Sequence, residues 1–112
     1  MSKLEEKIAA YVAEAKKLNL SIDEKLIGAV AKGLGPSIYN ADAETIAASD
    51  KAELDRLKAN FLIKKLGLKD GPELDKAIEE VIDQVGKSNR NKYRVIVYAL
   101  LTKKFKKENV YA

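Results

Sequence analysis

The chain contains neither cysteine nor histidine among its 112 residues. Their absence excludes disulfide bonds, thiolate nucleophiles, the most common zinc ligands and the usual general base near neutral pH. We therefore expect no metal site and no cofactor. A chain without cysteine also fits a reducing compartment, although secreted domains without disulfides share this feature.

Long apolar runs and flexible linkers are also missing. No segment approaches the roughly 20 apolar residues that span a bilayer, and four of the first seven residues are charged, unlike a signal-peptide core. No stretch rich in proline, glycine or serine divides the chain. We expect a cytoplasmic protein in which residues 1–112 form a single helical domain without membrane contact.

Amphipathic patterns are abundant, because apolar residues recur at helical intervals in four segments. The predicted helices span residues 3–18, 22–32, 51–66 and 72–85. Ser21 and Asp50 are expected to cap the second and third, since each precedes a glutamate at capping-box spacing. Glycines are expected to end three of the helices: Gly33, Gly67 and Gly86.

Residues 35–42 are the most irregular segment, and their polar side chains form the first candidate site: Ser37, Tyr39, Asn40 and Asp42. Asp42 is expected to cap a short helical turn over residues 43–48. A turn whose side chains bond nearby backbone explains these residues, and the edge of a binding pocket is the alternative. Tyr39 with Asp42 would then support proton transfer.

Residues 93–101 are the longest apolar run. Its β-branched residues would suit a strand, but no second strand is present to pair with it. We predict a helix over residues 89–106, capped by Ser88 and apolar on nearly every side, and therefore buried. The predicted fold is all-α, a compact array of about five to six helices around this C-terminal helix, which the other helices or a partner subunit would cover.

Positive charge is concentrated at the C-terminal end of the chain. The net charge is +4, yet residues 87–112 carry eight cations against one acid, Glu108. A helix N-terminus disfavours cations, so those at the start of the last helix indicate a bound phosphate or carboxylate, or counter-charge from Asp83 or Glu79. This candidate anion site comprises Lys87, Ser88, Asn89, Arg90, Asn91 and Lys92.

A second basic cluster follows the apolar run: Lys103, Lys104, Lys106 and Lys107. Cations at a helix C-terminus stabilise the helix dipole, so a solvated face explains them. Salt-sensitive contact with nucleic acid is the alternative. The neighbouring rings of Tyr98 and Phe105 fit a core better than a stacking platform for bases.

Three strings identify a resemblance: GPSIYNAD at residues 35–42, NFLIKKLGL at residues 60–68 and NRNKYR at residues 89–94. Together they resemble a family of short bacterial proteins, domain of unknown function 2853, over essentially the whole chain. The resemblance implies a small all-α array of helices. It implies no activity and no catalytic residues.

We expect a non-enzymatic protein-interaction or structural module that acts as a homodimer, because the very apolar helix and the acidic and basic segments could need a second subunit to cover them. The alternative is an anionic partner, either nucleic acid or a phosphorylated small molecule, bound by the basic C-terminal segment. An enzyme is the third hypothesis, and it would require Tyr39, Asp42 and Arg90 to converge in a cleft.

Overall fold

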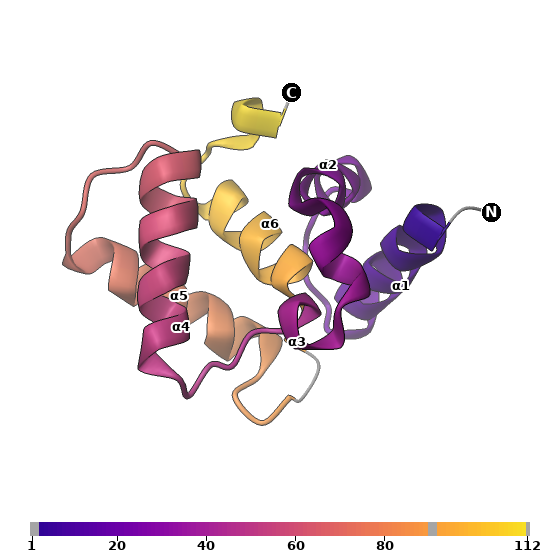
Figure 1. The fold of residues 1–112 in the computed structure, drawn as a ribbon, viewed down its shortest axis with the longest axis horizontal. Helices are drawn as coiled ribbons and strands as arrows, with labels where there is room; N and C mark the ends of the chain where they lie inside the picture. The colour runs from indigo at the N-terminus through magenta and orange to yellow at the C-terminus, as the bar shows by residue number, and fades with distance from the viewer. Residues whose placement is uncertain (1–2, 90–91, 112) are drawn as a thin grey trace.

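The fold is an array of helices around a central helix, α6 (Figure 1). The computed structural model describes residues 3–89 and 92–111. The α-helices are α1 (Lys3–Lys17), α2 (Glu24–Leu34), α3 (Ala41–Glu44), α4 (Lys51–Leu57), α5 (Pro72–Val85) and α6 (Arg94–Lys104). Shorter elements are the 3-10 turns η1 (Gly35–Tyr39) and η3 (Glu108–Tyr111) and the π-helical η2 (Lys58–Lys65). The all-α prediction is confirmed, and within the described ranges no helix is long and apolar enough to cross a membrane.

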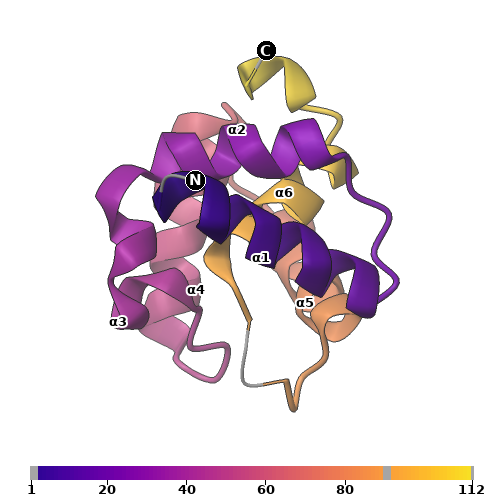
Figure 2. The same cartoon turned by 90° about the vertical axis from the view of Figure 1, so that its right-hand side faces the viewer.

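Helix α6 is the most buried element of the fold. Each residue from Val95 to Thr102 is at most 8% exposed. In Figure 2, α1 and α2 lie in front of α6 while α4 and α5 lie behind it. Phe61 of η2 stacks on Tyr98 with ring centroids 3.9 Å apart. The prediction of a buried C-terminal helix is confirmed, and its cover comes from this same chain, so α6 gives no reason to expect a second subunit.

The beginning of α6 differs from the prediction. The helix starts at Arg94, with Tyr93 in the N-cap position, and not at residue 89 after a Ser88 cap. The chain just before it is extended, because the N–H of Ile46 donates to the Lys92 carbonyl over 2.9 Å and Thr45 forms an isolated bridge with Tyr93. This pairing with a distant segment replaces the first turn that local propensity predicts.

Two other helix starts also differ. Asp23, and not Ser21, caps α2, because its carboxylate accepts the N–H of Lys25 over 2.8 Å. Asn40, and not Asp42, caps α3 by accepting the N–H of Asp42 over 3.0 Å. In both cases the cap is another residue with a side-chain oxygen acceptor, two positions from the predicted one, so side-chain capping is as predicted and the position is wrong.

The end of α2 lies two residues later than predicted. The helix continues through Gly33 and ends before Gly35, whose φ of 64° ends it in the left-handed region. Gly33 has a packing role instead. A Cβ atom there would lie 3.3 Å from the ring of Tyr111, so the small residue allows η3 to pack against α2.

The helix predicted over residues 51–66 has the expected extent but changes form along its length. Asp50 caps it as predicted, and the α-helix α4 continues directly into η2. In η2 the backbone bonds follow π-helical spacing, since the N–H of Leu66 donates to the carbonyl of Phe61, five residues earlier, over 2.9 Å. Gly67, with φ of 72°, ends it as predicted.

We predict opposite effects for two glycine-to-alanine changes. Gly28 lies inside α2, where a Cβ would meet Ile8 Cδ1 at an ordinary 3.8 Å, so Gly28→Ala should raise the free energy of unfolding by about 0.5–1 kcal/mol. Gly67→Ala should lower it by about 1 kcal/mol, because φ is positive there. Urea titration measures the free energy of unfolding of both variants. A change of the same sign in the two would contradict the different roles assigned to Gly28, inside a helix, and Gly67, at a helix end.

Candidate functional site

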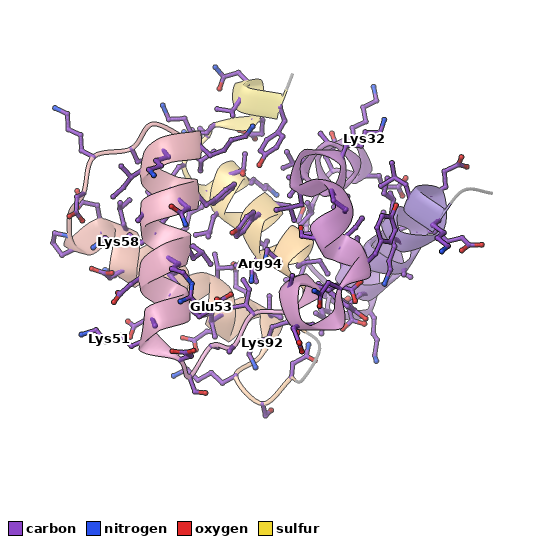
Figure 3. The ribbon with its side chains drawn as sticks, viewed as in Figure 1. Lys32, Lys51, Glu53, Lys58, Lys92 and Arg94 are labelled. Atoms are coloured by element: carbon purple, nitrogen blue, oxygen red, sulfur yellow. The ribbon has the colours of Figure 1, made fainter. Side chains whose placement is uncertain are left out.

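A partly buried ionic network joins α6 to α3 and α4 (Figure 3). The guanidinium of Arg94 pairs with the Glu53 carboxylate through Nη2, and its Nε donates to the Ala43 carbonyl over 2.8 Å. Its Nη1 donates to the Tyr98 hydroxyl over 3.2 Å, while Arg56 contacts the second Glu53 oxygen over 3.0 Å. This Arg94 network thus connects α6 to two elements that lie far earlier in the sequence.

Burial and charge act in opposite directions on this network. Burial by itself would raise the pKa of Glu53, but hydrogen bonds and charge from Arg94 and Arg56 outweigh it and hold that pKa below its ordinary value. Burial likewise opposes the charged form of Arg94, yet Tyr98 and Glu53 raise its pKa. Both members of the ion pair therefore remain charged at neutral pH.

A second network connects α3 to α1. Glu44 accepts hydrogen bonds from the Tyr11 hydroxyl over 2.6 Å and from Lys7 Nζ over 2.8 Å. Burial, followed by the hydrogen bond and charge of Glu44, raises the pKa of Tyr11, so its phenol stays neutral. The Tyr11 ring also lies 5.1 Å from that of Tyr93, between centroids. With the Arg94 network, these contacts hold α3 from both sides.

The predicted polar turn satisfies its own backbone. Ser37 Oγ donates to the Leu34 carbonyl over 2.9 Å, and Asn40 caps α3. Tyr39 and Asp42 are exposed. Within the part of the chain that the structure describes, no hydrogen bond joins Tyr39 to Asp42, and the turn does not assemble the proton-transfer pair considered above.

The predicted anion site does not lie at a helix N-terminus. Ser88 is six residues before Arg94, where α6 begins, and it does not cap that helix. Lys87 and Asn89 also precede α6, while Arg90 and Asn91 lie outside the described residues. The predicted helix start is therefore wrong, and of the described cations in this segment only Lys92 directly precedes the N-cap. Anion binding by this segment stays a prediction.

Several polar groups of this segment bind within the chain. Lys92 is 8% exposed, and its Nζ donates to the carbonyls of Lys87 over 2.7 Å and Asn89 over 2.6 Å. The Asn89 side chain donates to the Val85 carbonyl over 3.1 Å. Lys87 lies 3.4 Å from Asp83, the counter-charge that the sequence offered as an alternative to a bound anion.

Two of the four C-terminal lysines bond to other parts of the chain through their side chains, and the basic patch stays a prediction. Lys103 donates to the Ser21 carbonyl, and Lys104 pairs with Glu80 of α5 over 2.6 Å. Lys106 has φ of 55°, at the end of α6, and the Lys107 N–H donates to the Thr102 carbonyl over 2.9 Å. These residues help to hold the end of α6 in place.

A groove of about 730 Å³ runs along α2, the α1–α2 connection and η3. Its apolar lining is Leu20, Ile22, Leu26, Ala29 and Tyr111, and its polar lining is Lys16, Ser21, Asp23, Lys25, Lys103 and Glu108. Burial raises the pKa of Tyr111 to about 12, so this phenol is neutral. Of the predicted site residues, only Lys103 lies here.

A second groove of about 590 Å³ lies between α1 and α2. It is lined by Glu5, Ile8, Ala9, Val12, Ala13, Lys16, Glu24 and Lys25. This surface was not predicted from the sequence, although a signal was present. α1 carries alanine at positions 9, 10 and 13, beyond the stripe that its core contacts require. The two grooves share Lys16 and Lys25, so they lie next to each other on one continuous surface.

These arrangements suit binding through apolar surface with charged edges. Among residues 3–89 and 92–111, no three acidic side chains gather where they could hold a metal ion. Fold and site together define a small all-α domain with an apolar α1–α2 surface. The chain belongs to the family described as "Protein of unknown function (DUF2853)", which matches residues 10–109. No protein of curated function matches the chain.

We predict that neutralising Glu53 destabilises the fold. Glu53→Gln leaves the largely buried Arg94 without its counter-charge, which should lower the free energy of unfolding by about 2–4 kcal/mol. Asp55→Asn on the same helix is the matched control, because Asp55 is exposed, and it should change stability by less than about 0.5 kcal/mol. Equal effects of the two variants in urea titration would show that the network stabilises nothing.

The effect of Glu53 should depend on pH. Its folded pKa lies below the unfolded value, so its stabilisation is present above the unfolded pKa and is lost as pH falls through the folded pKa. The difference in unfolding free energy between the wild type and Glu53→Gln should therefore shrink below about pH 4.3. Urea titrations at several pH values measure this difference. A difference that stays constant into the acid range would contradict a lowered pKa of Glu53 in the folded state.

Proposed function

We propose that the protein is a cytoplasmic protein-interaction module that acts as a homodimer and not as an enzyme. The observation that carries this proposal is the apolar surface formed by α1 and α2, with its two adjoining grooves. Half-buried Ile8 and Val12 lie there beside exposed Ala9 and Ala13. Apolar surface that continues beyond the core is typical of a site that binds another protein.

The placement of the ionisable groups supports binding over catalysis. Groups with shifted pKa values suggest an active site when they line a cleft. Tyr111 lines the larger groove, but burial raises its pKa to about 12, so its phenol stays neutral and offers no base near neutral pH. Glu53 and Tyr11, whose pKa values are also shifted, line neither of the two grooves, and each has hydrogen-bond partners within the chain. Their role in holding α3, α4 and α6 together accounts for their chemistry.

Binding of an anionic partner through the basic C-terminal segment stays a prediction of the sequence. Lys92 and Lys104 are engaged with groups of this chain, which reduces the charge that they offer to a ligand. Lys103 lies at the edge of the larger groove, where it also bonds to the chain itself. These contacts within the chain count against the anionic partner.

We predict a dimer in solution. Sedimentation velocity at micromolar concentrations should give a species of twice the chain mass of 12.4 kDa, in exchange with monomer on dilution. Raising the salt concentration should change the equilibrium only modestly, because the contact is mainly apolar. A strict monomer over the whole micromolar range would reject the proposal.

A further inference from the structure

The face of α1 that lines the smaller groove has a defined composition. Its members are Glu5, Ile8, Ala9, Val12, Ala13 and Lys16. Figure 2 shows α1 nearest the viewer, with no other described element crossing in front of it. Acid lies at one end of the face, base at the other, and apolar residues between them. Four of the six members of this α1 face are exposed, and Ile8 and Val12 are half-buried.

The order of residues on the α1 face is symmetric about one point, midway between positions 10 and 11. Glu5 and Lys16 are equally far from that point, and so are the pairs Ile8 with Ala13 and Ala9 with Val12. If two copies of a helix pack antiparallel about a two-fold axis at the midpoint, residues at equal distances come level with each other. Every member of the face then meets another member.

The residues that come level are complementary in size and in charge. Ile8 would meet Ala13 of the second copy, and Val12 would meet Ala9, so each branched side chain faces a methyl group and the helices can approach closely. Glu5 would meet Lys16 twice, once at each end. The existing pair between Lys16 and Glu24 is 3.3 Å long and mostly exposed, so it holds Lys16 only weakly.

We propose that a second copy of this chain docks on the α1 face, with the two α1 helices antiparallel and crossing between positions 10 and 11. This inference rests on the homodimer proposed above and adds its surface and register. Glu24 and Lys25 of α2 border the same groove and supply a charged rim. An interface with an apolar centre and a polar edge is the usual anatomy of a protein contact.

A matched pair of arginine variants tests the surface. Ala9 and Ala10 are both exposed on α1, but only Ala9 belongs to the α1 face. Ala9→Arg should raise the dimer dissociation constant by about 100-fold or more, since a charge would be buried opposite Val12 without a partner. Ala10→Arg should leave it unchanged, and circular dichroism checks that both variants keep the helical content of the wild type.

Cysteine cross-linking tests the register, because the natural chain has no cysteine. Glu5→Cys and Lys16→Cys chains, mixed under oxidising conditions, should form a disulfide-linked pair of unlike chains. Each variant alone should not, because its two cysteines would lie about 16 Å apart along the antiparallel helices, beyond disulfide reach. Cross-linking of Glu5→Cys with itself would indicate parallel helices and overturn the register.

The outcomes separate the two proposals. A wild-type monomer would overturn both the homodimer and the α1 face. A wild-type dimer that persists unchanged in Ala9→Arg would overturn the α1 face while the homodimer stands. Dissociation by Ala9→Arg but not by Ala10→Arg, together with cross-links between unlike chains only, is the result expected from antiparallel docking.

Discussion

Burial of α6 from Val95 to Thr102 is the constraint on which the other contacts depend. A helix with eight consecutive buried residues needs neighbours on every side, and its polar groups need partners within the chain. Arg94 is such a polar group, and it lies at the N-terminal end of α6, where a cation without a partner is unfavourable. Glu53 supplies the opposite charge and Ala43 a carbonyl, so one side chain places α4 and α3 against α6.

Burial of α6 also explains what many of the polar residues do. Those near α3, such as Glu44 and Tyr11, connect elements that pack around α6. Lys92 turns inward to hold the loop before α6 in place. Residues whose chemistry would attract attention in a sequence are thus accounted for by structural contacts. The apolar α1–α2 surface is a part of the described chain that such contacts leave uncovered.

The composition of α1 links the fold to the proposed function. Tyr11 and Ala15 face the core, while the apolar character of the helix continues to Ala9 and Ala13 on the surface. The buried side alone would make α1 a conventional amphipathic helix. Because the surface side pairs large with small residues and acid with base about a single midpoint, it is self-complementary, which is the property that an isologous dimer requires.

The sequence by itself determined the features that depend on neighbouring residues. Periodicity predicted α5 at residues 72–85 and the burial of α6, and local capping chemistry predicted Asp50 and Gly67. The tertiary structure alone decided where α6 begins, because the pairing of Ile46 with Lys92 comes from a distant segment. It also decided that Glu53 meets Arg94 across 41 positions. Helix propensity and capping act within about one turn, whereas these contacts form only when the whole chain packs.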